Sequence, residues 1–151
     1  MSTISVRTHF AAGHRILGLT GPGQKCRNVH GHTFHVTWTF TQEAGDTTLE
    51  FGAIKATLRE MILTLFDHAF LVHRDDDFRA YLRAGKLKFY TTEHPPTTEV
   101  IVAEIALQTV KLFPRAPLVS IELCEGPDNM ATWIKPTLVA VAEDVLAEVG
   151  S

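Results

Sequence analysis

The sequence predicts an α+β protein with an antiparallel sheet. Residues 4–14 and 30–40 alternate apolar and polar side chains with a period of two, which is typical of strands with one buried face. Residues 54–65 instead space their apolar side chains as an amphipathic helix does. A second predicted helix ends near residue 112, and another alternating segment follows at residues 119–125. Because strands and helices come in runs, they do not form the one-by-one alternation of a parallel α/β protein.

Length and composition indicate one ordinary globular domain. We expect a single domain over residues 1–151, with a core of about 4–135 and a helical extension of about 137–150. The net charge of −3 gives no basic surface for nucleic acid or an anionic membrane. No segment approaches the ~18 apolar residues of a membrane span, and the first ten residues lack the apolar part of a signal peptide. With only two cysteines and no disulfide framework, a cytoplasmic location is expected.

The first two predicted strands carry the clearest patterns. In the first, Ile4, Val6 and Phe10 share one face with His14, provided that the strand stays regular to its end. In the second, one face carries the row His30, His32, Phe34, Val36, Trp38 and Phe40. The glycine- and proline-rich residues 18–28 between the two strands are expected to form a loop.

A turn, a helix and an irregular region are predicted next. Residues 42–48 are typical of a turn, and the helix after them carries the apolar stripe Ile54, Leu58, Met61, Ile62 and Leu65. We predict that residues 67–96 are irregular and that their acidic run, residues 75–77, lies on a solvated surface. Thr97 or Thr98 is expected to cap the second helix.

The C-terminal part of the sequence predicts a hairpin and a last helix. Val119, Ile121 and Leu123 alternate with polar residues, and residues 130–135 are expected to form the partner strand after a turn. The amphipathic residues 138–149 predict a terminal helix.

Three histidines lie where the two apolar rows end. His30 and His32 share a strand face, and His14 is in phase with the row of the first strand. A single histidine in such a place is more often a hydrogen-bonded core residue. Three together leave two interpretations open, hydrogen-bonded imidazoles or a metal ion, because an imidazole buried without a partner is costly. Zinc held by three neutral imidazoles would keep one open position, as catalytic zinc sites do, although such a set also accepts other divalent ions.

Other polar residues are candidates for chemistry. Cys26 lies between two basic residues, and neighbouring cations favour a thiolate; it could also be a small buried residue or a fourth zinc ligand. Glu125 continues an inward-facing apolar row, so its carboxylate either binds a guanidine-like edge or simply ends the strand in solvent. Asp67 and His68 suit proton transfer, although such a pair is more often a plain helix terminus.

Together these motifs resemble one family, the 6-pyruvoyltetrahydropterin and 6-carboxytetrahydropterin synthases. The matching pieces extend from about residue 4 to residue 135 and read, in order, "FAAGHRI", "KCRNVHGHTFHV", "LEFGAIK", "FDHAFL", "PPTTEV" and "IELCEGPDN". The resemblance implies a T-fold, a four-stranded antiparallel sheet with two helices on one face, to which this chain would add its C-terminal helix. It also implies a homohexamer of two stacked trimers with active sites at subunit interfaces, and a small pterin triphosphate as partner.

The resemblance implies a role for each candidate residue. It assigns zinc binding to His14, His30 and His32, general-base catalysis to Cys26 with a relay of Asp67 and His68, and pterin binding to Glu125, Thr97 and Thr98. The implied substrate is 7,8-dihydroneopterin triphosphate. One branch of the family eliminates triphosphate and yields 6-pyruvoyltetrahydropterin. The other also releases acetaldehyde and leaves 6-carboxytetrahydropterin, on the route to queuosine and other 7-deazapurines, and the spacing Cys-x3-His-Gly-His favours this second branch.

Four positions depart from the pattern that this family usually shows. Glu50 and Ala53 flank Phe-Gly where aspartates are usual, and Val100 and Gly126 follow the two glutamates of the matched motifs. These departures leave room for a different pterin substrate. A catalytically silent pterin- or purine-binding protein and a zinc hydrolase of another small molecule are therefore alternatives, although a pure binder has no need of Cys26 and the relay.

Overall fold

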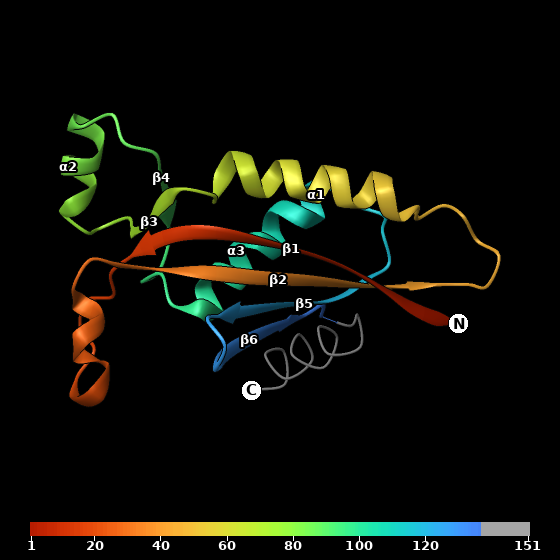
Figure 1. Cartoon of the computed structure of the whole chain (residues 1–151), viewed down its shortest axis with the longest axis horizontal. Helices are drawn as coiled ribbons and strands as arrows, with labels where there is room; N and C mark the ends of the chain where they lie inside the picture. Colours follow the sequence, from red (N-terminus) through yellow and green to blue (C-terminus); the bar gives the residue numbers. More distant parts are fainter. Residues whose placement is uncertain (137–151) are drawn as a thin grey trace, which may run out of the picture.

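A six-stranded sheet forms the centre of the molecule in the computed structural model, which describes residues 1–136 (Figure 1). The strands are β1 (Ser2–His14), β2 (His30–Gln42), β3 (Ala69–His73), β4 (Phe89–Thr92), β5 (Leu118–Glu125) and β6 (Asn129–Ile134), in the spatial order β4-β3-β1-β2-β5-β6. The helices are α1 (Phe51–Leu65), α2 (Phe78–Ala84), α3 (Thr98–Leu112) and the 3-10 helix η1 (Gly21–Arg27). The predicted α+β class is confirmed, and the antiparallel strands β1, β2, β5 and β6 form the predicted part of the sheet.

The pairing of β1 with β2 fixes which side chains enter the core. The two strands are antiparallel along their whole length, with Val6 opposite Trp38, Phe10 opposite Phe34, and His14 opposite His30. Because one strand face is buried, this register places the even-numbered residues of both strands on the inner face. Except for the partly buried Ile4, the inner side chains of the apolar rows are nearly inaccessible, and the three predicted histidines continue the same rows to the end of the sheet.

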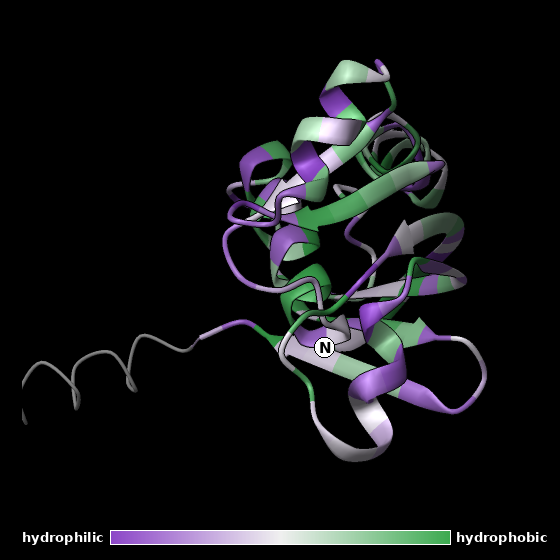
Figure 2. Ribbon diagram, turned by 90° about the vertical axis from the view of Figure 1, so that its left-hand side faces the viewer, coloured by the Kyte–Doolittle hydropathy of each residue, from purple (hydrophilic) through white to green (hydrophobic). Residues whose placement is uncertain are grey.

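Helices α1 and α3 cover the inner face of the sheet, and the side chains that they bury share one core with β1, β2 and β5. The carboxylate of Glu50 caps α1 by accepting the N–H groups of Gly52 and Ala53, at 2.7 and 2.8 Å. Thr97 is the N-cap of α3, as expected for Thr97 or Thr98. In Figure 2 the hydrophobic segments gather in the strands and their covering helices, whereas the peripheral loops are largely hydrophilic.

The prediction that residues 67–96 are irregular was wrong. They form β3, α2 and β4, and β3 pairs in parallel with Ala12–His14 at the end of β1. The prediction of a solvated acidic run was also wrong for its central residue, because the Asp76 side chain is only 2% exposed and pairs with Arg15. Asp75, by contrast, is 73% exposed.

The C-terminal hairpin follows the prediction. Strands β5 and β6 pair from Glu125 opposite Asn129, and Gly126 takes a φ of 68°, which a residue with a Cβ rarely adopts. The predicted helix over residues 138–149 lies outside the described residues. Among residues 1–136, no helix is both long and apolar enough to cross a membrane.

Candidate functional site

The three predicted histidines meet at the end of the sheet where β1 ends and β2 begins. Their ring centroids are 4.5 Å apart for His14 and His30, 5.2 Å for His14 and His32, and 5.1 Å for His30 and His32. One ring nitrogen of each lies within 4.8 Å of the others. Gly31 lets the strands approach here, because a Cβ at this position would lie 3.1 Å from the Ala12 carbonyl oxygen.

Backbone carbonyls orient two of the imidazole rings. The Nδ1 atom of His14 lies 2.8 Å from the carbonyl oxygen of Pro96, and that of His30 lies 2.7 Å from the carbonyl oxygen of Asn28. Since a carbonyl oxygen only accepts hydrogen bonds, each Nδ1 donates, and each neutral ring keeps its lone pair on Nε2. Burial lowers the pKa of His14 below its ordinary value, which favours the neutral form that binds metals.

Two of the Nε2 atoms have no partner. The Nε2 atoms of His14 and His32 are buried and make no hydrogen bond within the described residues. The Nε2 atom of His32 does lie 3.0 Å from a carboxylate oxygen of Glu125, but the two groups are not aligned for a hydrogen bond. Orphaned buried imidazole nitrogens beside a carboxylate fit a divalent cation such as zinc.

Glu125 lies at the inner face beside these histidines. It is the last residue of β5 and lies opposite Phe34, so its carboxylate follows the apolar row inward and its side chain is only 14% exposed. The hydroxyl of Thr98 donates to its Oε2 atom. Thr97, the other predicted substrate contact, uses its hydroxyl to cap α3. The carboxylate is therefore held in place and keeps acceptor capacity for a ligand.

Cys26 belongs to the short helix η1, which extends beyond the same end of the sheet (Figure 1). Its carbonyl oxygen accepts the N–H of Ile16 at 2.8 Å, which ties η1 to the chain just after β1. The cysteine is half-buried and is not part of a disulfide. Its thiol makes no hydrogen bond to any residue that the structure describes. Cys124 is also half-buried and lies on β5, one position out of phase with Glu125.

Asp67 and His68 form the predicted pair at the edge of β1. The Asp67 carboxylate accepts the N–H of Ala11 at 3.0 Å and lies 2.8 Å from Nδ1 of His68. Burial opposes ionisation here, but these two hydrogen bonds prevail and lower the pKa of Asp67 below its ordinary value. His68 has a φ of 56°, a left-handed conformation that is uncommon for a residue with a Cβ and is often found at functional sites.

The structure unites only part of the predicted catalytic set. His68 lines a cavity of about 730 Å³ whose lining also includes His30 and His32. Neither Cys26 nor Asp67 lines this cavity, and within residues 1–136 no hydrogen bond or ion pair joins either of them to the three histidines. The three candidate metal ligands are thus brought together within one subunit. The candidates for proton transfer, Cys26, Asp67 and His68, lie nearby but are not joined to them.

Sequence reasoning missed the residues that support the histidines. Pro96 and Asn28 act through backbone carbonyls, which no side-chain pattern can indicate. Arg15 follows His14 directly and makes two hydrogen bonds to the buried Asp76 carboxylate. An arginine next to a candidate metal ligand, in a chain with an acidic run, was a signal that could have predicted this pair.

The four positions that depart from the family pattern lie in different places. Glu50 and Ala53 are at the beginning of α1, which Figure 1 places at the opposite end of the molecule from the end of β1 and the beginning of β2, the segments that carry the histidines. Gly126 follows Glu125 in a tight turn, and the N–H of Val100 faces the hydroxyl of Thr97 at 3.5 Å. Only the last two therefore border the candidate site of the same subunit.

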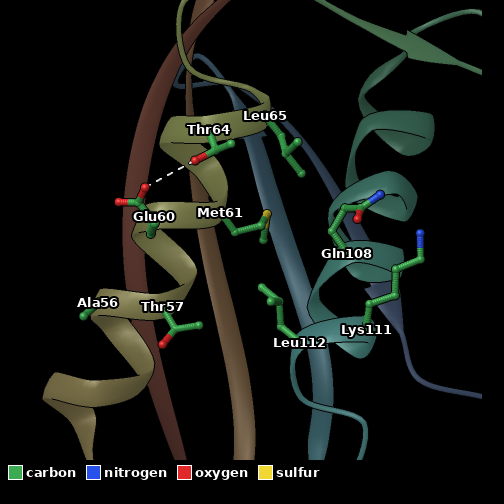
Figure 3. Close-up of a pocket in the computed structure, with 9 residues that line it drawn as sticks. All are labelled: Ala56, Thr57, Glu60, Met61, Thr64, Leu65, Gln108, Lys111 and Leu112. Atoms are coloured by element: carbon green, nitrogen blue, oxygen red, sulfur yellow. Dashed lines mark hydrogen bonds between the residues drawn. The ribbon is translucent and has the colours of Figure 1, made fainter.

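An apolar groove elsewhere does not share this chemistry. It has a volume of about 590 Å³ and lies between α1 and α3 (Figure 3). Met61, Leu65 and Leu112 point into it, and its ionisable side chains are Glu60 and Lys111. It contains none of the histidines or Glu125, so we do not assign it to the candidate site.

The chain is similar in sequence to known pterin synthases. The sequence model of the family 6-pyruvoyl tetrahydropterin synthase matches residues 3–135. The 6-carboxy-5,6,7,8-tetrahydropterin synthase of Haemophilus influenzae is 26% identical over 145 residues, which span 88% of this chain and 99% of that protein.

Two solved structures share the fold. A Wolinella succinogenes protein has a TM-score of 0.71 at 19% identity and covers 89% of this chain and 98% of its own. The 6-pyruvoyl tetrahydropterin synthase of Caenorhabditis elegans has a TM-score of 0.64 at 20% identity, with 89% and 96% covered. The predicted T-fold is confirmed by this likeness.

Proposed function

Because the chain belongs to the 6-pyruvoyl tetrahydropterin synthase family, we propose that it is a zinc-dependent 6-carboxytetrahydropterin synthase. It would convert 7,8-dihydroneopterin triphosphate and water into 6-carboxy-5,6,7,8-tetrahydropterin, acetaldehyde and triphosphate. One observation carries the proposal: three clustered imidazoles, two of them oriented by backbone carbonyls and two with orphaned Nε2 atoms, lie beside the partly buried carboxylate of Glu125. The name of the Haemophilus influenzae relative supports the carboxy product over the pyruvoyl product.

Each group has a distinct task in this proposal. His14, His30 and His32 would hold zinc, which when bound supplies a Lewis acid that makes neighbouring protons of the substrate side chain easier to remove. Glu125 would accept two parallel N–H bonds from the edge of the pterin, while Thr98 holds the carboxylate in position.

Cys26 would take a proton from the substrate side chain as general base. Asp67 would orient His68 through their 2.8 Å contact, so that the His68 ring can pass protons at its free Nε2 atom. The Cys26 thiol and the His68 ring would act on the same substrate, so both have to reach the substrate side chain.

We further propose a homohexamer of two trimers, located in the cytoplasm, with active sites at subunit interfaces. Two open sheet edges support this assembly: within the described residues, β1 pairs with β3 only over Ala12–His14, and β6 has no neighbour on its outer side. An unpaired edge of this length is a template for another strand. A neighbouring subunit could then supply the relay of Asp67 and His68, because within one subunit this relay is not joined to the three histidines. Native mass spectrometry of the full chain would show six copies if the assembly is correct.

A product assay tests the proposed activity. The zinc-loaded protein is incubated with 7,8-dihydroneopterin triphosphate, and the products are separated by liquid chromatography and identified by mass spectrometry. The expected result is a 6-carboxy product with one acetaldehyde per turnover. A 6-pyruvoyl product would keep the site and change the reaction, and no product from fully metallated protein would refute the proposed activity.

A further inference from the structure

The groove between α1 and α3 leaves apolar surface in contact with water (Figure 3). We refer to it as the α1–α3 groove. Leu112 points into it and is still 46% exposed, whereas Met61, which also lines it, belongs to the protein core. The groove therefore extends the core outward between the two helices, and an apolar occupant would remove its surface from water.

The walls of the α1–α3 groove offer few free hydrogen-bonding groups. The hydroxyl of Thr57 donates to the carbonyl oxygen of Ala53 at 3.1 Å, one turn earlier in α1. The hydroxyl of Thr64 likewise bonds to the carboxylate of Glu60, the bond drawn in Figure 3. Since these hydroxyls already have partners, the groove suits an occupant that presents apolar side chains.

The chain continues past the part that it shares with its family. The family model matches residues 3–135, the structure describes the chain up to Pro136, and residues 137–151 follow. In these last residues, apolar side chains recur at the spacing of one helix face: Leu138, Val141, Val145 and Val149. A helix with such a stripe has to bury it against another apolar surface.

The charges of the last residues complement those near the groove. Residues 137–151 contain Glu143, Asp144 and Glu148 but no lysine or arginine. Lys111 lines the α1–α3 groove, and Arg115 lines the cavity next to it. Within residues 1–136, neither of these two cations makes an ion pair or a side-chain hydrogen bond.

The described chain ends near the end of α3 that borders the groove. The N–H of Lys135 donates to the carbonyl oxygen of Val119 at 2.9 Å. Val119 comes shortly after residues 113–117, which line a cavity of about 550 Å³. Because Leu112 of the groove is directly followed by Phe113 of this cavity, the cavity lies between the end of β6 and the groove along the chain.

The length of the segment also fits. On α1 the groove extends from Ala56 to Leu65, which is about 14 Å along a helix axis. Residues 138–149 would form a helix of about 18 Å. One helix of this length is thus enough to cover the whole groove.

We propose that residues 137–151 dock in the α1–α3 groove of the same chain, with their apolar stripe against Met61, Leu65 and Leu112. Their acidic side chains would then approach Lys111. The docked segment would brace α3, the helix whose residue Thr98 holds the carboxylate of Glu125. This inference does not rest on the proposed function.

Thermal unfolding of the full chain at one fixed protein concentration tests the docking from both sides. On the segment, V141D/V145D places charge on the apolar stripe, and A140D/A147D adds the same charge on the opposite face. In the groove, L112A is compared with L107A, because Leu107 is also on α3 and 50% exposed but does not line the groove.

The variants on the stripe and in the groove should lower the Tm more than their controls. We expect a fall of about 5–10 °C for V141D/V145D and of at most about 3 °C for A140D/A147D. L112A should lower the Tm by about 3–6 °C and L107A by less than about 2 °C. Equal shifts within each pair would overturn the proposal.

Cross-linking tests which chain supplies the segment. A short bismaleimide is added to T64C/V149C and to L63C/V149C, since Leu63 is next to Thr64 on α1 but lies outside the groove. Gel mobility and peptide mass spectrometry identify the linked residues. The expected link joins positions 64 and 149 within one chain, and the control should give little of it. A link between two chains would assign the groove to a second copy, and no link in T64C/V149C would leave the groove to another partner; both results would overturn the proposal.

Discussion

Replacement of Asp76 by asparagine is expected to destabilise the protein by about 2–3 kcal/mol at pH 7. The Asp76 carboxylate accepts two N–H groups of Arg15, and its Oδ1 atom also accepts the N–H of Phe78 at 2.9 Å. Asparagine has nearly the same shape but no charge. It would therefore leave a guanidinium group, 21% exposed, without its main partner.

The magnitude follows from the contacts. A hydrogen bond to a charged group contributes about 1.5–3 kcal/mol, and loss of one partner of a buried ion pair costs about 3–5 kcal/mol. The Arg15 guanidinium keeps its contact with Asp77 at 2.8 Å and with the Phe78 ring at 5.0 Å, so we expect less than that upper range. The control is Asp75→Asn, because the Asp75 side chain is 73% exposed and its charge contacts are no closer than 3.8 Å.

The effect should also depend on pH. The hydrogen bonds from Arg15 outweigh burial and hold the pKa of Asp76 below its ordinary value. A carboxyl group whose pKa is lowered by folding stabilises the native state above its unfolded pKa of about 3.9, and this stabilisation is lost as pH falls through the folded pKa. The difference between wild type and Asp76→Asn should therefore be full at pH 7 and shrink below about pH 4.

Urea unfolding, followed by tryptophan fluorescence at one fixed protein concentration, measures both effects. With a slope of about 2 kcal/mol/M, the midpoint of Asp76→Asn should fall by about 1–1.5 M at pH 7. A midpoint equal to that of Asp75→Asn would refute the buried ion pair. A difference that persists unchanged at pH 3 would refute the charge-based explanation.

Three further predictions concern the site and the core. Cys26→Ala should bind zinc normally but lose about 10²-fold or more in kcat, whereas Cys124→Ala should retain activity; normal turnover of Cys26→Ala would exclude a general-base role. Glu125→Gln should weaken pterin binding about 10-fold or more in a fluorescence titration at full zinc content, and a loss of zinc would instead make Glu125 a metal ligand. Thr109→Val removes the hydroxyl that accepts the buried Trp38 indole N–H at 2.9 Å. The free energy of unfolding, measured in urea, should fall by about 1–3 kcal/mol. A change near zero would show that the indole finds another acceptor.

Residue periodicity predicted the long elements because they are long enough to show a period. The strands β1 and β2 have thirteen residues each and the helices α1 and α3 fifteen, so many positions repeat the same pattern. Strands β3 and β4 have five and four residues, too few to show alternation. Their parallel pairing beside β1 depends on contacts between distant segments, which the sequence does not express.

The candidate site was predictable to a similar degree. Strand phase placed His14, His30 and His32 on one inner face, since the register is antiparallel and His14 lies opposite His30. The sequence could not show that the carbonyl group of Pro96, 82 residues further along the chain, orients the His14 ring. Nor could it show that Asp67 lies at the edge of β1, because that position is set by how α1 ends against the sheet.

The central claim is that the three histidines hold the metal ion of the active site. Anomalous scattering at the zinc absorption edge, from crystals of the zinc-loaded full chain, tests it most directly. The expected result is one peak per subunit within bonding distance of Nε2 of His14, His30 and His32. If the crystals contain one zinc ion per subunit but the anomalous peak lies at other residues, the result would contradict this assignment of the three histidines.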